Sequence, residues 1–277
     1  MKAILLTPLL WVACAGAGSE TPPSMPEGYR YDNRTEVGLE RELEEISGIE
    51  YVAGQGFLAH NDEEGIVYRL NAEFRITDAF PFAGEGDYEE IKKVGDDLYV
   101  LSSKGDVWSM KYDGAGIGEF SRHEWPGKKA EFEAMIYDGT SRQLILICKN
   151  SKEGKQARIS PGYGFDPETG QFSAEALFSL DWDSVEKVAG KELKNLHPSA
   201  AAVHPLTKEI YLLASIEKLL LVLSPDGAIQ SAHPLDKNRF PQPEGITFDE
   251  KGNMYISNEA ADTDRATVVT FAYQNPQ

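Results

Sequence analysis

The stretch PEGITFDEKGNMYISNE, residues 243–259, carries the pattern that decides the fold. It consists of an apolar strand, a tight turn and a second apolar strand that ends in polar residues. Four other stretches repeat this pattern: EISGIEYVAGQGFLAHND (45–62), YEEIKKVGDDLYVLSSKGD (88–106), FEAMIYDGTSRQLILICKN (132–150) and PSAAAVHPLTKEIYLLASIEK (198–218). Further short strands follow each pair, for example IVYRLN and RITDAFPF after the first. The chain past residue 29 therefore reads as repeated units of short antiparallel strands.

The spacing of the units predicts a β-propeller. The residues that open the inner strands lie 42, 44, 66 and 45 positions apart, and they are Ser47, Glu89, Glu133, Ser199 and Glu244. Units of about 40–50 residues with four strands each are typical of propeller blades. A single four-stranded sheet cannot cover its own apolar faces, so the units are expected to pack around a common axis. We expect an all-β, five-bladed propeller over residues 29–277.

The last unit supplies only three strands of its own: PEGITFDE, NMYISNE and ATVVTFAYQ. We expect the region between Tyr29 and Leu39 to provide the missing outer strand, which would close the ring and remove an exposed sheet edge. A six-bladed ring is the alternative, although no sixth inner-strand motif is found.

The 66-residue step contains an insertion between Ser151 and Asn195. Its segment DWDSVEKVAGKELKN has helix-forming composition, and Asp181 is a suitable N-cap. The insertion is either a lid over one face of the ring or a decoration between two blades.

Antiparallel pairing places a second set of residues beside the first, 14 or 16 positions further along the chain. These residues are Asn61, Ser103, Lys149, Ser215 and Asn258. Both sets should surround the mouth of the central channel, where Glu89, Glu133 and Glu244 would repel one another unless they are neutralised.

Three ways of neutralising these acids remain open: a cation binds among them, some of them are protonated, or basic side chains pair with them. Carboxylates and Asn carbonyls are the hard oxygen ligands that Ca²⁺ prefers, and this predicts a calcium ion held by Glu89, Glu133, Glu244, Asn61, Asp62 and Asn258. Alternatively, each Glu pairs with a nearby base, and Lys104 and Lys149 are suitably placed in the sequence.

The five His residues show no zinc-binding spacing, and no GxSxG, P-loop or Rossmann motif is present. His60 and His197 fall close to the expected ring face, where either is a candidate general base. If the protein is a hydrolase, Lys104 and Lys149 are the candidates for holding an anionic substrate group.

The net charge of −18 argues against nucleic acid and anionic lipid headgroups as partners. Residues 1–13 contain Lys2 and the apolar run AILLTPLLWV, which is typical of a secretory signal peptide. The following Cys14 resembles the lipidated cysteine of a bacterial lipoprotein, and residues 14–28 have the composition of a flexible tether. Ala15 lacks the charge associated with inner-membrane retention, which favours the outer membrane. Plain secretion is the alternative.

The chain has two cysteines. If Cys14 carries lipid, no disulfide can form, and Cys148 is expected to be a buried thiol in the apolar run LILIC.

Several motifs together resemble the SdiA-regulated family of bacterial exported proteins. They are EISGI, GDYEEI, LYVLSSKGD, HPSAAAVHP, KLLLVLSPDG and QPEGITFDEKGNMYISNE, in this order from about residue 40 to the C-terminus. The resemblance implies a five-bladed propeller, distantly similar to NHL-repeat proteins, with a calcium site at the ring and no established catalysis. Carried over, it implies Glu89, Glu133 and Glu244 as ligands first, with Asn61, Asp62 and Asn258 second.

Three functions are compatible with these observations. The first is a monomeric, calcium-binding propeller of the cell envelope that binds a small molecule or an envelope partner. The second is a calcium-dependent lactonase-like or phosphoesterase-like hydrolase acting at the central channel, for which fold analogy is the main support. The third is a scaffold whose acids only hold the blades together.

Overall fold

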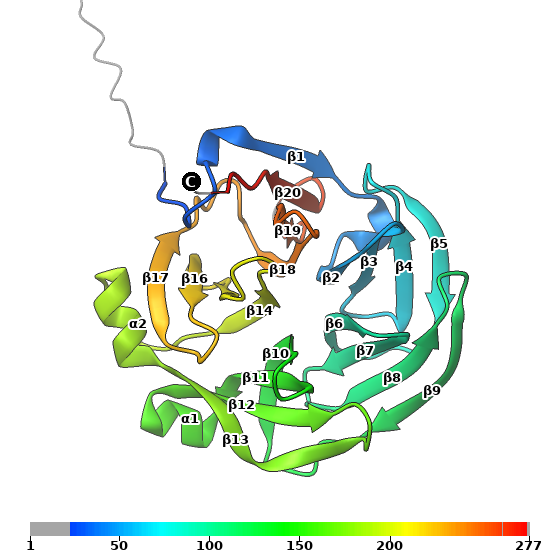
Figure 1. The fold of residues 1–277 in the computed structure, drawn as a ribbon, viewed down its shortest axis with the longest axis horizontal. Coiled ribbons are helices and arrows are strands. Elements are labelled where there is room, and N and C mark those ends of the chain that lie inside the picture. The colour runs from blue at the N-terminus through cyan, green and yellow to red at the C-terminus, as the bar shows by residue number, and fades with distance from the viewer. Residues whose placement is uncertain (1–22, 262, 276–277) are drawn as a thin grey trace, which may run out of the picture.

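The computed structural model describes residues 23–261 and 263–275, which form a ring of five four-stranded antiparallel sheets (Figure 1). The prediction of a five-bladed propeller is therefore confirmed, and the six-bladed alternative is wrong. The predicted signal peptide (1–13) and Cys14 lie outside the described residues. No helix in the described part of the chain is long and apolar enough to cross a membrane.

The blades follow one another in chain order around the ring (Figure 1). Blade 1 contains β2 (Ile46–Val52), β3 (Gly56–Asn61), β4 (Ile66–Leu70) and β5 (Ile76–Pro81). Blade 2 contains β6 (Tyr88–Val94), β7 (Asp97–Ser102), β8 (Val107–Tyr112) and β9 (Ile117–His123). Blade 3 contains β10 (Ala130–Asp138), β11 (Gln143–Ser151), β12 (Ile159–Asp166) and β13 (Gln171–Asp181). Blade 4 contains β14 (Pro198–Val203), β15 (Ile210–Ala214), β16 (Leu219–Leu223) and β17 (Ile229–Pro234). Blade 5 contains β18 (Pro243–Phe248), β19 (Met254–Asn258), β20 (Thr267–Phe271) and β1 (Arg34–Gly38).

Blade 5 takes its outer strand from the other end of the chain. Strand β1 pairs with β20 in antiparallel register, from Arg34 opposite Phe271 to Gly38 opposite Thr267. The backbone N–H of Gln274 also donates to the carbonyl of Gly28, at 2.8 Å. The first and last described segments thus lie side by side.

The core is divided among the interfaces between blades. Five apolar clusters are present among the described residues, and each combines residues of two neighbouring sheets. In one of them Ala134 and Ile147 of blade 3 pack with Ala201 and Leu212 of blade 4. This follows from the sequence, because the inner strands are apolar on both faces and each face needs a neighbouring sheet to cover it.

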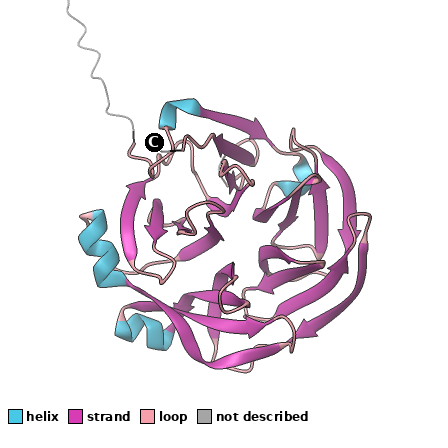
Figure 2. Ribbon diagram, in the orientation of Figure 1, coloured by secondary structure: helices cyan, strands magenta, loops and turns pink. Residues whose placement is uncertain are grey.

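The helices lie outside the sheets (Figure 2). Short 3₁₀ turns span Tyr31–Asn33 and Arg41–Leu43, and the insertion in blade 3 forms α1 (Lys152–Ala157) and α2 (Trp182–Ala189). The predicted N-cap of α2 is confirmed, because Asp181 accepts a hydrogen bond from the Ser184 N–H at 2.7 Å. Helix α2 lies at the outer edge of the ring beside β17, so it does not act as a lid over the central opening (Figure 1). Its buried Trp182 and Val185 instead extend the apolar cluster between blades 3 and 4.

Candidate functional site

All five inner strands carry an irregularity at the residue that the sequence singled out. The register of each inner strand skips one residue, which faces no partner: Ser47, Glu89, Glu133, Ser199 and Glu244. Such bulges redirect a side chain away from the regular ladder and are common beside functional sites. The repeat in the sequence therefore corresponds to a repeated backbone device around the axis.

The two serines of this set fasten neighbouring blades. The Ser47 hydroxyl donates to the carbonyl of Glu89 at 3.3 Å, and the Ser199 hydroxyl donates to the carbonyl of Pro243 at 2.9 Å. Each bond runs from one blade to the next, immediately before or at a Glu-bearing bulge. Two of the five bulge positions are thus occupied by serines that connect neighbouring blades, and the other three are occupied by glutamates.

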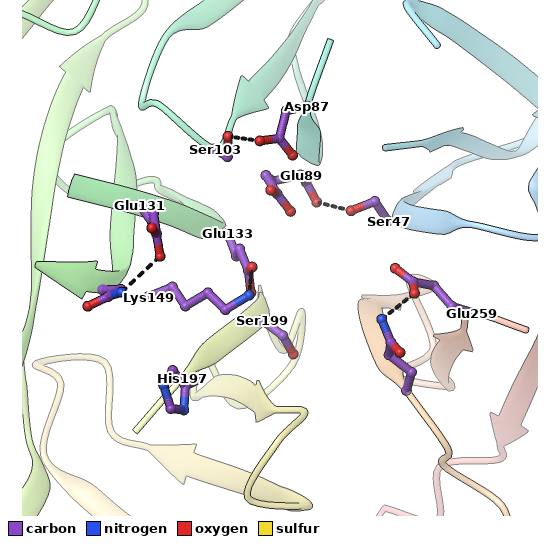
Figure 3. Close-up of polar contacts among 12 residues, drawn as sticks. Ser47, Asp87, Glu89, Ser103, Glu131, Glu133, Lys149, His197, Ser199 and Glu259 are labelled. Atoms are coloured by element: carbon purple, nitrogen blue, oxygen red, sulfur yellow. Dashed lines mark hydrogen bonds and ion pairs between the residues drawn. The ribbon is translucent and has the colours of Figure 1, made fainter. Parts of the chain in front are cut away.

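The three glutamates converge on one lysine. Glu133 and Lys149 form an ion pair within blade 3. Burial raises the pKa values of Glu89, in blade 2, and Glu244, in blade 5, and the charge of Lys149 offsets part of both rises. Figure 3 shows Ser47, Glu89, Glu133 and Lys149 facing a common central space from different blades. The prediction that distant glutamates meet near the axis is consistent with this arrangement.

One lysine does not neutralise the remaining acids of the mouth. Burial, together with the neighbouring charge of Asp87 and that of Glu244, raises the pKa of Glu89 to about 9. Burial and the charges of Glu244, Glu45 and Asp62 raise the pKa of Glu259 to about 8. The pKa of Glu244 is also raised, chiefly by burial. These carboxyl groups hold protons more tightly than in water because they lie close together in a desolvated place.

The residues predicted as the second set of ligands, Asn61, Asp62 and Asn258, differ in their hydrogen bonding. The Asn61 amide is engaged locally, donating to the carbonyl of Glu42 at 3.0 Å and accepting from the Glu64 N–H at 2.8 Å. The Asp62 carboxylate has one buried oxygen without a hydrogen-bond partner among the described residues, and its pKa is raised to about 6, chiefly by burial. Asn258 is fully buried, its amide N–H donates to Thr267 at 3.3 Å, and its Oδ1 has no partner among the described residues.

Below the mouth, the axis is filled by a buried ionic cluster that the sequence reasoning missed. Lys92 Nζ lies 2.9 Å from Glu90 Oε1 and 3.9 Å from Glu50 Oε2. Glu90 Oε2 also accepts from the N–H of Ala201 at 3.5 Å. Glu90 lies in blade 2 and Ala201 in blade 4, which are not neighbours, so this side chain crosses the axis. Glu90 and Lys92 thus form a buried ion pair close to the axis.

A signal for this cluster was present in the repeat. The residue after the bulge is Glu90 in blade 2 and a small residue in each of the other four blades. The small equivalents are Gly48, Ala134, Ala200 and Gly245. Four small residues around an axis leave space that one long side chain can fill. Comparing equivalent repeat positions, rather than searching for acids, would have identified Glu90.

The two candidate histidines have different surroundings. His60 is fully buried, its Nδ1 lies 2.9 Å from the carbonyl of Asn61, and burial lowers its pKa to about 4. It is therefore neutral at pH 7 and inaccessible to a substrate in this conformation. His197 is half-buried near the mouth (Figure 3). Its Nδ1 lies 2.8 Å from Glu217 Oε1. A carboxylate at Nδ1 fixes the ring and favours Nε2 as the reactive nitrogen.

A polar pocket of about 880 Å³ opens beside the mouth between blades 2 and 3. Its lining includes Glu89, Glu133, Lys149 and Lys104, so four residues that were singled out from the sequence share one cavity. Asp87 also lines it and accepts a hydrogen bond from Ser103. Lys104 is exposed, whereas Lys149 is paired. Ion pairing thus neutralises Glu133, as the alternative to calcium predicted, but not Glu89.

The fit of the mouth to a metal ion is incomplete. In residues 23–261 and 263–275, no group of three or more His, Cys, Asp or Glu side chains is arranged to hold a metal ion. The donor chemistry nevertheless suits a hard cation, because the mouth presents carboxylates together with the unpartnered buried oxygens of Asp62 and Asn258.

The predicted cysteine environment is confirmed for the part of the chain that is described. Cys148 is buried and free, and burial raises its pKa to about 12. It is therefore an unreactive thiol rather than a nucleophile.

Comparison with known proteins supports the fold and one family. The SdiA-regulated family model matches residues 130–261, which confirms the resemblance over β10 to β19 and the loops between them. Among solved structures, Myxococcus xanthus glutaminyl cyclase is similar with a TM-score of 0.59 and 12% identity, over 87% of this chain and 96% of that one. A glucose dehydrogenase is similar with a TM-score of 0.55 and 11% identity, over 85% and 99%. A Bacteroides thetaiotaomicron protein of unknown function has a TM-score of 0.50 and 16% identity, over 81% and 55%. At these identities the likeness concerns the fold alone.

Proposed function

We propose that this propeller, which matches the SdiA-regulated family over residues 130–261, is a binding module that takes a divalent cation, Ca²⁺ in first place, at its mouth. The observation that carries the proposal is the excess of carboxylates over bases there. Glu89, Glu244 and Glu259 come from two different blades; burial raises all three pKa values, and the charge of Glu244 further raises those of Glu89 and Glu259. A cation that enters such a group stabilises it, because its charge offsets the repulsion between the carboxylates.

The residues that would hold the ion are Glu89, Glu244 and Glu259, with Asp62 and Asn258 as further oxygen donors. Glu133 is the least suitable of the predicted ligands, because Lys149 already neutralises its charge. No three acids coordinate one point as they stand, so binding involves rotated side chains or water ligands, both of which are ordinary for Ca²⁺. Bound there, the ion would supply positive charge for the oxygen atoms of a ligand, and the chain's own residues would orient that ligand in the adjoining pocket.

Calorimetric titration of Ca²⁺ into chelator-treated protein should show one site. Glu89→Gln and Glu244→Gln should each weaken binding by about 10-fold or more, since each removes a charged oxygen donor. Glu131→Gln is the matched control, because Glu131 lies near the mouth but is exposed and bonded to Asn150. Absence of binding at millimolar Ca²⁺, or an equal loss in the control variant, would contradict the proposal.

The stabilisation by Ca²⁺ should also depend on pH. A carboxyl whose pKa is higher in the folded state contributes stability at low pH that is lost as the pH rises through that pKa. With pKa values of about 6, 8 and 9 for Asp62, Glu259 and Glu89, metal-free protein should lose stability between pH 5 and 9. Added Ca²⁺ should reverse this loss, so the rise in melting temperature should be larger at pH 8 than at pH 5.5. An equal rise at both values would contradict the assignment of these groups to the site.

A second function, a cation-dependent hydrolase, is favoured by one observation. His197 is held by Glu217 with its other ring nitrogen available, which suits a general base, and Lys104 lines the adjoining pocket, where it can hold an anionic group. The measurement that separates it from the binding module is turnover of lactones, aryl esters and phosphoesters with and without Ca²⁺. Turnover that requires Ca²⁺ and is lost in His197→Ala would favour the enzyme.

We also propose that the chain is attached to the cell envelope, in the outer membrane, through lipid on Cys14. The support is the sequence AILLTPLLWVAC alone. Labelled palmitate should enter the protein but not the Cys14→Ser variant, and labelling that persists in the variant would exclude this anchor.

A further inference from the structure

The insertion in blade 3 builds a second cavity, next to the mouth but separate from it. This cavity of about 590 Å³ is bounded by the loop before β10, by helix α1 and by strands β12 and β13. In Figure 1, α1 lies beside β12 and β13 at the outer part of blade 3. A cavity of this size accommodates a small molecule.

One wall of the cavity is aromatic and rigid. Trp125 packs against Tyr163, Phe132 and Phe172, with ring centroids 4.9, 5.1 and 5.4 Å away. Its backbone N–H donates to Asp106 at 2.9 Å, and its indole N–H donates to the carbonyl of Lys128 at 2.9 Å. Because both polar groups of Trp125 are satisfied by the protein, the ring offers a fixed apolar surface to a ligand.

The other walls are made of small residues. They include Ala130, Gly154, Ala157, Ala174 and Ala176. Helix α1 can approach β12 because Gly154 has no side chain: a Cβ there would lie 2.7 Å from the carbonyl oxygen of Ile159. Small residues facing a fixed indole leave a space that suits a planar ring.

The charged residues that line the cavity are two lysines, Lys128 and Lys129, and two glutamates, Glu153 and Glu175. At the rim, Lys128 is paired with Glu153 at 2.8 Å, while Lys129 forms no ion pair within the described residues. Lys129 also lines the pocket beside the mouth, as do Trp125, Gly127 and Ala130. An unpaired lysine at the edge of the cavity favours an anionic group of a ligand.

From the aromatic wall, the small opposite walls and the unpaired lysine, we infer that this cavity binds a small molecule with a planar aromatic ring and a carboxylate. The ring lies against Trp125, and the carboxylate contacts Lys129 at the edge shared with the mouth pocket. The insertion then adds a ligand-binding pocket to blade 3. This site does not need a cation at the mouth.

Titration calorimetry with 1-naphthoate as the probe tests the inference in the full chain. 1-Naphthoate should bind at least about 5-fold more tightly than 1-naphthalenemethanol, which lacks the charge, and than cyclohexanecarboxylate, which lacks the planar ring. Binding should persist with chelator and in Glu244→Gln, so that failure of the cation proposal and failure of this one are distinguishable. If no probe shows binding when it is titrated to a concentration 5-fold above the highest protein concentration, the inference is overturned.

Two variants locate the site. Ala176→Trp should abolish binding by filling the cavity, because Ala176 lies on the exposed face of β13, where a larger side chain can be accepted without disturbing the core. Lys129→Gln should reduce the affinity for 1-naphthoate to that for the neutral probe and leave the neutral probe unaffected. Lys155→Gln on α1 is the matched control, because Lys155 does not line the cavity. Unchanged binding in Ala176→Trp with an unchanged melting temperature, or equal effects in the two lysine variants, would place the ligand elsewhere.

Discussion

Replacing Lys92 by Met should destabilise the protein by about 3–5 kcal/mol at pH 7, the range found when one member of a buried ion pair is removed. The substitution leaves Glu90, which is fully buried, and Glu50 without their common cation. For a domain of this size the loss corresponds to a fall in melting temperature of roughly 6–20 °C. Thermal unfolding followed by circular dichroism measures it.

The loss should grow with pH, which distinguishes it from a loss of packing. Burial already raises the pKa of Glu90 to about 7 against the opposing charge of Lys92. Without Lys92, folding requires Glu90 to be protonated, while the unfolded chain ionises near pH 4.3, so stability must fall as the pH rises above that value. The variant should therefore differ more from the parent at pH 8 than at pH 5.

Two further variants test the cause. Lys93→Met makes the same chemical change at a half-exposed neighbour and should cost less than about 1 kcal/mol. Adding Glu90→Gln to Lys92→Met should restore at least half of the loss, because the stranded charge is gone. Equal effects of the two lysine substitutions, or no recovery in the double variant, would show that the ionic cluster does not hold the axis.

Removing β1 should have the second large effect. A chain that begins at Leu39 loses the strand that pairs with β20 and also Tyr29, whose hydroxyl donates to the carbonyl of Gly252 at 2.6 Å. Loss of one buried aromatic side chain alone costs about 3–5 kcal/mol, which is a large part of the stability of an ordinary domain. The uncovered edge of β20 would also be open to pairing with another chain. Compared with a chain that begins at residue 23, the truncated protein should melt much lower and should aggregate in size-exclusion chromatography.

A circular permutant is the matched control for this truncation. It begins at Leu39 and carries residues 23–38 after Gln277, joined by a short Gly–Ser linker. Because Gln274 and Gly28 are already hydrogen bonded, the linker spans a short distance, and β1 becomes the last strand of blade 5. The permutant should melt within a few degrees of the parent. If it behaves like the truncated chain, or if the truncated chain is as stable as the parent, the role assigned to β1 is wrong.

Much of the fold was predictable because it rests on local and repeated signals. Five strand–turn–strand stretches at blade spacing indicate five sheets, and the apolar character of their inner strands requires each sheet to be covered by the next. The same alignment located Glu89, Glu133 and Glu244, which the structure places at equivalent bulges. The helix at Asp181 was predictable for the same reason, since its N-cap is a local signal.

What each acid does at the mouth was not predictable from spacing. Glu133 and Glu89 occupy equivalent positions, yet Lys149 pairs with the first, while the second keeps a raised pKa. The difference arises because the two glutamates have different neighbours: Lys149 lies on the strand beside Glu133, whereas Glu89 has Asp87 nearby. Electrostatic neutralisation depends on distances between side chains, which a list of positions does not contain.

By itself, the sequence determined the number of blades, the place of the acidic positions and the unusual acidity of the chain, because these depend on periodicity and composition. Only the tertiary structure decided that Glu90 crosses the axis to Ala201, that α2 lies at the edge of the ring, and that Trp125 faces α1 across a cavity. These contacts join segments that are distant in the chain. Which of them form is settled by how five sheets fill the space around one axis, and no local pattern records that.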